Sequence, residues 1–365
     1  MELLLTHSTA LEAYRSTGLR ALLAKGEVCP DAVPSCLPAP ERLSQLRRYL
    51  EFYGFCPKVM EALVSGVGGR RRSSSLRTRV CGRPLPTGSI MVIGEGVACV
   101  TPEHLAVQMA PLLTKLELQV LLCELLGVYA IVPSISDGML QRNSPLMAKE
   151  SIERHIDRLD RIDGIDLVRQ ALPATVEGLA SPMETRLCLR TVLSPCYGGY
   201  GMEIDAANRP LDVDAVGKRG SRKVRKPDFV FGALPGSRAK VRFVALEYNG
   251  NDHLTRERQA EDERRTNEIL AYGGIEYQLN KELYDDLEYM DALMRTIADD
   301  IGRPCYRMTE ERKRKRRALR LALKEELDRI DGVTWGGRKR GDYRKVATEE
   351  PLDAVELVPV DAYGV

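Results

Sequence analysis

The sequence predicts an α/β protein that contains more than one domain. Its 365 residues are a prior for two domains or three. Short apolar runs bounded by Gly and Pro occur together with longer amphipathic segments, a pattern typical of strands combined with helices. Hydrophobic residues make up 44% of the chain, charged residues 29% and aromatic residues 5%. We therefore expect a sizeable, mainly aliphatic core under a well-solvated surface.

The first part of the chain combines both kinds of element. We predict a strand at residues 2–6, then an amphipathic helix that starts after Ser8 and Thr9. Thr101 is expected to cap a helix with Pro102 at its first position. The run KLELQVLLCELLGVYAI reads as a buried helix, and SIERHIDRLDRIDGIDLVRQAL as a helix pair or one broken helix. These elements predict a mixed α+β N-terminal domain.

The second part has a different order. The helix SPMETRLCLRTVL is followed by three expected strands, YGMEID, KPDFVFG and KVRFVALEYN. A long helix, HLTRERQAEDERRTNEILAYG, precedes the strand GIEYQLN and the helix LEYMDALMRTIADDI. We thus predict a mixed N-terminal domain at 1–150, a helical linker at 151–179, an α/β domain at 180–302, and a basic helix with a flexible tail at 303–365.

Composition excludes several classes of protein. The nine Cys are scattered, with no C-x-x-C pair and no metal-like spacing with His, which indicates reduced thiols and a cytoplasmic location. The run MELLL is too short for a signal peptide, and no apolar run reaches the length of about 18 residues that a membrane helix needs. The net charge of +2 does not by itself predict a polyanionic partner.

Three acidic residues stand at informative positions. Glu184 lies in the first helix of the second domain, Asp228 begins a strand and Glu247 ends the next strand. Carboxylates from the ends of adjacent strands can converge on one hard cation such as Mg²⁺. Left unpaired, they would repel each other, so a cation or a proton should join them. The apolar strand VRFVALE would then be a rigid mount for a metal ligand.

The motifs around these acids resemble the PD-(D/E)xK nuclease superfamily over roughly residues 180–300. They are SPMETRL, PDFVF, ALEYNGNDH and RQAEDERRTNEILAYGG, and within the superfamily they look closest to proteins similar to very-short-patch repair endonucleases. The resemblance implies a restriction-endonuclease-like mixed sheet flanked by helices. The N-terminal half is more weakly similar to AbiEi-type abortive-infection proteins.

Carried over to this chain, the resemblance implies that Asp228 and Glu247 bind Mg²⁺ or Mn²⁺. It implies a supporting or metal-water role for Glu184. Metal-bound water would attack a phosphodiester bond, with the ion stabilising both the attack and the leaving oxygen.

The sequence departs from the family pattern at one position. The superfamily lysine falls at Asn249, and an amide cannot supply its positive charge. Lys226, Lys240 and Arg265 are candidates to replace this lysine. Arg265 is also a candidate for a phosphate contact. His253 is a candidate base to activate water, since its ordinary pKa is about 6.5.

Each of these residues also has a purely structural interpretation. Glu184 could be a first-turn acid that favours the helix dipole, and Asp228 a turn or strand-edge acid. Asn249 could belong to a turn and His253 to a helix start. Glu247 is harder to explain in this way, because a charge that ends a buried strand needs a partner.

Positive charge clusters near the C-terminus. Residues 303–345 contain 16 Lys/Arg and 7 Asp/Glu. A predicted helix there carries the candidate nucleic-acid contacts Arg312, Lys313, Arg314, Lys315, Arg316 and Arg317, which join Lys226 and Arg265. A solvated surface helix is the alternative. The run GGRRRSSSLRTR offers a second basic strip.

Three hypotheses for function follow. The favoured one is a metal-dependent DNA endonuclease acting in phage defence or DNA repair. The second is a catalytically inactive, antitoxin-like DNA-binding regulator that keeps the nuclease fold, with Asn249 as its main support. The third is a protein-interaction component of a defence system. We expect DNA as a partner and no membrane, and the sequence leaves open a homodimer and a toxin or defence-system partner.

Overall fold

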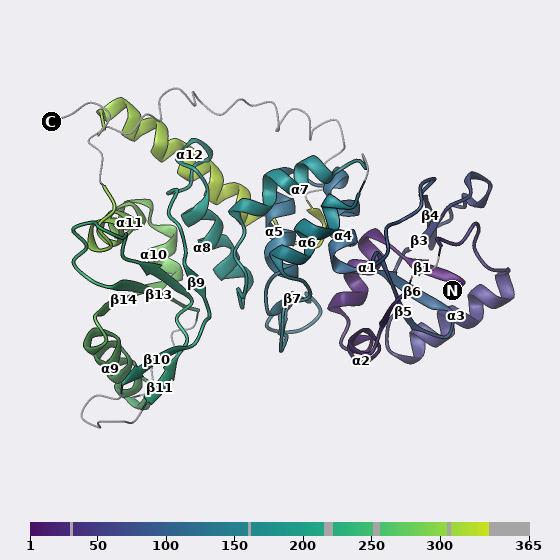
Figure 1. The fold of residues 1–365 in the computed structure, drawn as a ribbon, viewed down its shortest axis with the longest axis horizontal. Helices are drawn as coiled ribbons and strands as arrows, with labels where there is room; N and C mark the ends of the chain where they lie inside the picture. Colours follow the sequence, from purple (N-terminus) through teal and green to yellow (C-terminus); the bar gives the residue numbers. More distant parts are fainter. Residues whose placement is uncertain (30–31, 160–161, 215–221, 251–255, 305–307, 336–365) are drawn as a thin grey trace.

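The computed structural model describes residues 1–29, 32–159, 162–214, 222–250, 256–304 and 308–335. Figure 1 shows two sheets at opposite ends of an elongated molecule, with a layer of helices between them. The fold is mixed α/β, as the sequence predicts.

The N-terminal sheet has six strands in the order β2-β5-β6-β1-β3-β4. Their bounds are β1 (Leu3–Leu5), β2 (Glu27–Cys29), β3 (Met60–Val64), β4 (Leu76–Val80), β5 (Ile90–Gly94) and β6 (Val97–Val100). The central strand β1 pairs parallel with β6 and antiparallel with β3. Strand β1 is paired on both sides, and its three leucines are fully buried within the N-terminal core.

Three helices lie between strands of this sheet in the chain: α1 (His7–Arg15), α2 (Arg20–Ala24) and α3 (Pro40–Phe52). The helices that follow the sheet fill the middle of the molecule, and they are α4 (Pro102–Met109), α5 (Lys115–Leu125), α6 (Lys149–Asp157) and α7 (Ile165–Ala171). Single-turn helices lie at η1 (Val67–Gly69), η2 (Ala110–Leu112) and η3 (Leu172–Ala174), and a hairpin at β7 (Tyr129–Ile131) and β8 (Met139–Gln141). Helix α5 begins with a capping box, in which Thr114 and Glu117 bond each other's backbone N–H groups.

The C-terminal sheet has four strands in the order β14-β13-β12-β9. Its elements are α8 (Pro182–Val192), η4 (Pro195–Tyr197), β9 (Ala206–Ala207), β12 (Phe229–Gly232), β13 (Phe243–Asn249), α9 (Arg256–Ala271), β14 (Gly274–Asn280), α10 (Lys281–Asp285), α11 (Leu287–Asp300) and α12 (Glu310–Arg329). A separate ribbon pairs β10 (Leu211–Asp214) with β11 (Arg222–Arg225). Strands β13 and β14 run parallel, whereas β12 is antiparallel to both of its neighbours.

The side chains of the C-terminal sheet alternate between its two faces. Phe229, Val244 and Leu246 belong to a large core shared with α8 and α11. Val230 and Ala245 point to the other face, where they pack with Ile269 of α9. By the period of two along a strand, Asp228 and Glu247 lie on this second face, below α9.

Two large cores hold the molecule together. One gathers buried residues between Leu3 and Leu172, and the other gathers buried residues between Val120 and Ile330. Helix α5 contributes to both, because Leu121 joins the first core and Val120 the second. The domain boundaries expected at 150, 179 and 302 remain predictions.

Most long elements form where the sequence predicts them. The helix pair at α6 and α7 and the strands β12, β13 and β14 are confirmed. The buried helix predicted for KLELQVLLCELLGVYAI is confirmed as far as Leu125, but the last three residues of that run form strand β7. The predicted start after Ser8 and Thr9 is wrong, because α1 begins at His7. Thr101 does precede α4, but its hydroxyl donates to the Gly88 carbonyl at 3.0 Å instead of capping the helix.

The predicted strand YGMEID is also wrong. Its backbone N–H groups bond the end of α8 instead of a neighbouring strand: Tyr200 donates to the Arg190 carbonyl at 2.9 Å, and Met202 to the Thr191 carbonyl at 2.9 Å. Only the two residues of β9 that follow join the sheet. The sequence interpretation also missed β3 and the β10–β11 ribbon.

Within the described residues, no helix combines the length and apolarity needed to cross a membrane.

Candidate metal centre

Two candidate metal ligands meet at the end of the β12–β13 ladder. Phe229 pairs with Leu246, so Asp228 and Glu247 are the next residues outward on the two antiparallel strands. The Tyr248 backbone N–H donates to the Asp228 carboxylate at 2.7 Å, which fixes that side chain against β13. The two acids therefore lie on neighbouring strands, as the sequence predicts.

Glu184 reaches the same place from helix α8. Ser181 begins this helix and accepts the Glu184 backbone N–H at 3.1 Å, so the first turn is fixed. The Glu184 carboxylate is buried and accepts hydrogen bonds from the Ala180 backbone N–H at 2.8 Å and the Asn208 amide at 2.6 Å. Burial, then the neighbouring Asp228, raises the pKa of Glu184 to about 7.

The pKa of Asp228 is raised as well, and burial is the main cause. The Tyr248 N–H and the Arg265 guanidinium act in the opposite direction but do not cancel it. Glu184 and Asp228 are therefore two neighbouring carboxylates whose charges the protein does not fully balance. Such a pair needs a proton or a cation, and oxygen ligands suit Mg²⁺ or Mn²⁺.

Glu247 differs from these two acids because it already has a cationic partner. Arg265 of α9 forms an ion pair with Glu247, and its Nε lies 2.9 Å from the Glu276 carboxylate of β14. One guanidinium thus bridges carboxylates from two neighbouring strands. A metal ion bound to Glu247 would have to share this carboxylate with Arg265 or displace it.

The remaining residues predicted from the family pattern are spread around this centre. Asn249, at the end of β13, donates to the Gln278 amide oxygen at 3.2 Å. Lys226 is exposed just before Asp228. Lys240 precedes β13 and pairs with Asp299 and Asp300, so the whole strand separates it from Asn249 and it cannot replace the family lysine. His253 lies outside the described residues.

Two residues of the site were missed by sequence reasoning. Asn208 has a left-handed backbone with φ of 50°, and besides its bond to Glu184 its N–H donates to the Pro227 carbonyl at 3.0 Å. It thereby ties α8 to the segment that carries Asp228, and a non-glycine residue in this conformation often marks a functional site. Glu276 is the second, and its side chain is fully buried. In the sequence Asn208 precedes Arg-Pro, which indicates a turn but does not indicate that its side chain bonds Glu184.

The acids do not form a complete metal cage as they stand. Within the described part of the chain, no three His, Cys, Asp or Glu side chains are grouped so that they could hold an ion. A cavity of about 760 Å³ lies nearby beside β9, but it is lined by residues such as Glu203 and Asp205 and not by Glu184, Asp228 or Glu247.

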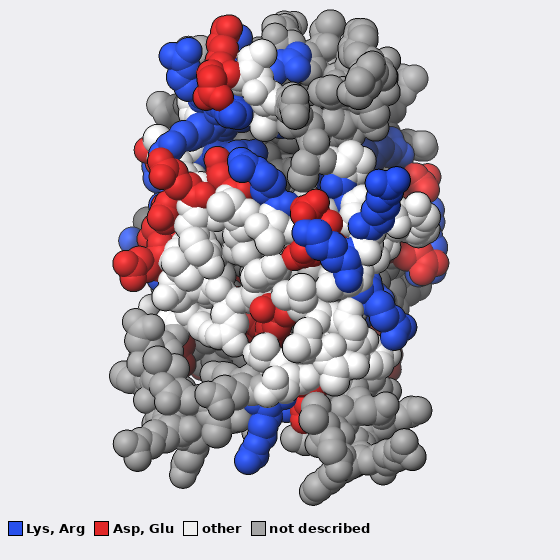
Figure 2. Space-filling model, turned by 90° about the vertical axis from the view of Figure 1, so that its left-hand side faces the viewer, with Lys and Arg blue, Asp and Glu red and all other residues white. Residues whose placement is uncertain are grey.

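The basic helix α12 forms as predicted, but acids neutralise much of its charge. Lys313 pairs with Glu310 at 2.7 Å and Arg317 with Glu288 at 2.9 Å, and Lys315 lies 3.6 Å from a Glu311 oxygen. Figure 2 shows the C-terminal end of the molecule, where Lys and Arg side chains alternate with Asp and Glu around an uncharged centre. The helix is therefore not part of a continuous basic face on this side.

No family model, curated protein or solved structure matches the chain.

Proposed function

We propose that the chain is a metal-dependent DNA endonuclease whose C-terminal domain has a restriction-endonuclease-like arrangement. The observation that carries the proposal is that Asp228 and Glu247 are neighbours at one end of the β12–β13 ladder, with the buried Glu184 close to Asp228. Three carboxylates from a helix and two adjacent strands are a suitable donor set for Mg²⁺ or Mn²⁺. The sequence motifs of the PD-(D/E)xK superfamily support the same proposal.

In this proposal Asp228 and Glu184 hold the metal, and Glu247 joins them. The bound ion would polarise the phosphodiester and lower the pKa of a coordinated water. The protein groups keep the ligands in place: Asn208 orients Glu184, and the Tyr248 N–H orients Asp228. Arg265 neutralises Glu247 and Glu276 until the ion binds.

The proposed roles at the phosphate fall to basic and polar residues around the acids. Lys226 and Arg265 are the nearest candidates for phosphate contacts, and His253 is the proposed base. Asn249 occupies the position of the family lysine. Residues Arg312–Arg317 of α12 would add contacts to the DNA backbone. The proposed biological role of the endonuclease is phage defence or DNA repair.

A second candidate function is a catalytically inactive DNA-binding regulator. The ion pair between Arg265 and Glu247 favours it, because a built-in guanidinium can take the place of the metal's charge. Asn249 supports it further. In this case the acidic cluster would stabilise the fold and bind no metal.

The deciding experiment is cleavage of a mixed panel of duplex, mismatched, nicked and single-stranded DNA with Mg²⁺ or Mn²⁺. The panel is run with wild type, Asp228→Ala and the control Asp299→Ala, whose side chain is 62% exposed at the far end of the sheet. Metal-dependent cleavage that only Asp228→Ala loses supports the nuclease. Absence of cleavage with salt-sensitive DNA binding retained in all three proteins supports the regulator.

A further inference from the structure

The N-terminal sheet carries a second polar site, which the proposed nuclease centre does not use. A cavity of about 860 Å³ opens beside strand β4. Five arginines line it, together with one carboxylate: Arg70, Arg71, Arg72, Arg77, Arg79 and Asp163. This is the GGRRRSSSLRTR strip of the sequence, folded back on itself so that its two basic parts face one space.

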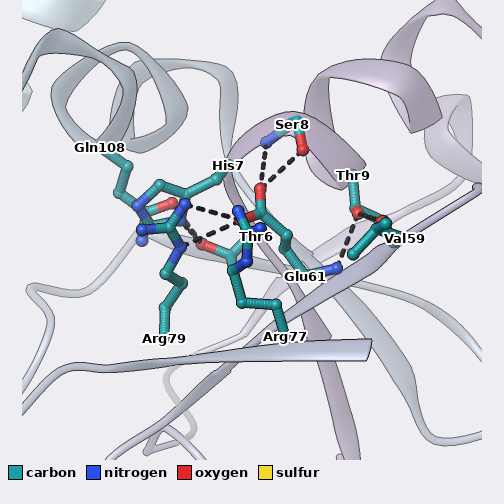
Figure 3. Close-up of polar contacts among 9 residues, drawn as sticks. All are labelled: Thr6, His7, Ser8, Thr9, Val59, Glu61, Arg77, Arg79 and Gln108. Atoms are coloured by element: carbon teal, nitrogen blue, oxygen red, sulfur yellow. Dashed lines mark hydrogen bonds and ion pairs between the residues drawn. The ribbon is translucent and has the colours of Figure 1, made fainter. Parts of the chain in front are cut away.

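A buried carboxylate fixes two of these arginines. Glu61 of β3 is only 3% exposed, and it lies 2.7 Å from an Arg79 nitrogen and 3.3 Å from an Arg77 nitrogen. On its other side Glu61 accepts the Ser8 hydroxyl at 2.6 Å and the Ser8 backbone N–H at 3.1 Å. Figure 3 shows both arginines directed toward this carboxylate.

The guanidinium groups that Glu61 holds keep free hydrogen-bond donors. Arg77 uses one nitrogen toward Glu61 and is 43% exposed, and Arg79 uses two nitrogens and is 29% exposed. A guanidinium carries five N–H donors, so each group can still bind an oxyanion. Fixing them beforehand lowers the entropy lost when a ligand binds.

The other three arginines add further positive charge to the cavity. Arg70, Arg71 and Arg72 are exposed, and among the residues that the structure describes none of their side chains pairs with a carboxylate. Of the carboxylates that the structure describes, Asp163 lines the cavity and Glu61 pairs with two of its five arginines, so the described lining carries an excess of positive charge. This contrasts with α12, where acids one turn away pair with several of the basic residues.

Two histidines, His7 and His104, line the cavity together with polar side chains such as Gln108 and with several aliphatic side chains. His7 bonds the Thr6 hydroxyl through Nδ1 at 2.9 Å, and Thr6 donates to the Gln108 amide oxygen at 2.6 Å. Thr6 must therefore accept the Nδ1–H of His7, so the other ring nitrogen of His7 is a hydrogen-bond acceptor. Leu85, Leu112 and Ile162 also line the cavity, and Leu112 is 41% exposed.

We propose that this pocket binds a segment of a nucleic-acid strand, with the arginines on its phosphates and a base or sugar against the aliphatic wall. Guanidinium groups match phosphate oxygens in a bidentate manner. Five of them exceed what one phosphate can use, which favours several phosphates in a row. The aliphatic wall matches the apolar face of a nucleoside and has no use for a free inorganic anion.

Strand binding at this pocket does not require the proposed metal centre, so it is measured in EDTA by fluorescence anisotropy with a labelled single-stranded oligonucleotide. The test variant is the triple substitution Arg70→Gln/Arg71→Gln/Arg72→Gln. The control is Arg48→Gln/Arg154→Gln/Arg295→Gln, which removes the same charge from three exposed arginines elsewhere. We expect the pocket variant to weaken binding at least about tenfold and to reduce the salt dependence by about two to three released ions.

A second pair of variants tests the wall without removing an arginine. Leu112→Asp is expected to weaken binding about tenfold, because it adds a negative charge beside the phosphates. The control Leu234→Asp changes a leucine of similar exposure, 39%, at the other end of the molecule, and should change binding less than about twofold.

Two results would overturn the proposal. In one, the two triple variants lose affinity equally, so the effect is that of net charge. In the other, ATP binds the pocket of wild type tightly while both triple variants bind the strand like wild type, which would assign the pocket to a free nucleotide. Urea unfolding of all variants establishes that they are folded.

Discussion

Glu61 and Glu184 are buried glutamates in the two halves of the molecule, and their electrostatic surroundings are opposite. They are 3% and 6% exposed, so burial acts to raise the pKa of both carboxyl groups. At Glu61 the hydrogen bond from Ser8 and the charge of Arg79 outweigh burial, and the pKa lies below its ordinary value. At Glu184 the neighbouring Asp228 adds to burial, and the pKa rises to about 7.

The comparison separates a carboxylate that organises other side chains from one that lacks a counter-charge. Glu61 is fully provided with partners, and its effect is to position arginines at a cavity. Among the described residues, Glu184 accepts hydrogen bonds from neutral donors, so its ionised form still needs a positive charge. Perturbed acids of this second kind are typical of catalytic and metal sites.

The largest effect is expected at the metal centre itself. Glu247→Gln keeps the shape of the side chain but removes its charge, so cleavage should fall at least about a thousandfold while DNA binding is retained or improved. Cleavage rates and anisotropy on the same oligonucleotide measure the two effects. A Glu247→Gln protein that cleaves DNA at the wild-type rate would exclude Glu247 from catalysis.

The next effect tests the organising role of Glu61. Glu61→Gln removes the charged partner of Arg77 and Arg79, which are themselves partly exposed, and we expect the free energy of unfolding to fall by about 2 kcal/mol. The control Glu2→Gln removes a carboxylate whose pair with Arg42 is 40% and 37% exposed, and should cost less than about 1 kcal/mol. Urea unfolding measures both, and equal losses would show that the burial of Glu61 has no special consequence.

The pH dependence of stability tests Glu184. Because its folded-state pKa is about 7 against an ordinary 4.5, the folded protein retains a proton that the unfolded chain releases. Stability should therefore fall as pH rises from about 4.5 to about 7, by up to about 3 kcal/mol. Glu184→Gln should remove this part of the slope. The free energy of unfolding is measured at pH 5 and pH 8 without divalent ions. An equal change between the two pH values in wild type and in the variant would contradict the assignment.

The smallest effect is expected at the position of the family lysine. Asn249 lies at a strand end, and its side chain makes one hydrogen bond of 3.2 Å to Gln278. Asn249→Lys should change the free energy of unfolding by no more than about 1 kcal/mol and leave cleavage unchanged or raised. Loss of folding in this variant would reveal a structural role for the amide.

Local patterns in the sequence predict much of the fold but little of the pairing within the site. The apolar run before Glu247 and the Ser181 cap predict β13 and α8, because these signals lie within each element. The proximity of Asp228 and Glu247 could also be predicted, because they lie at the ends of two strands that are expected to be neighbours. The bridge from Arg265 to Glu247 and Glu276 joins a helix to two strands, and no local pattern encodes it.

The Glu61 cluster and the failed strand illustrate the same limit. Glu61 sits inside the apolar run MEALV, and its partners come from residues 8, 77 and 79. Residues Tyr200–Met202 have a strand-like pattern, yet their N–H groups bond the last carbonyls of α8. Both outcomes depend on which distant backbone or side chain supplies the hydrogen bond, and this is decided by tertiary packing.

Direct binding of a divalent ion is the most direct test of the account. Mn²⁺ is titrated into wild type, Asp228→Asn and the control Asp299→Asn, and the free ion is followed by electron paramagnetic resonance. The account predicts submillimolar binding to wild type and to the control, with binding lost in Asp228→Asn. Equal binding by all three proteins, or binding by none of them, would contradict a metal centre at Glu184, Asp228 and Glu247.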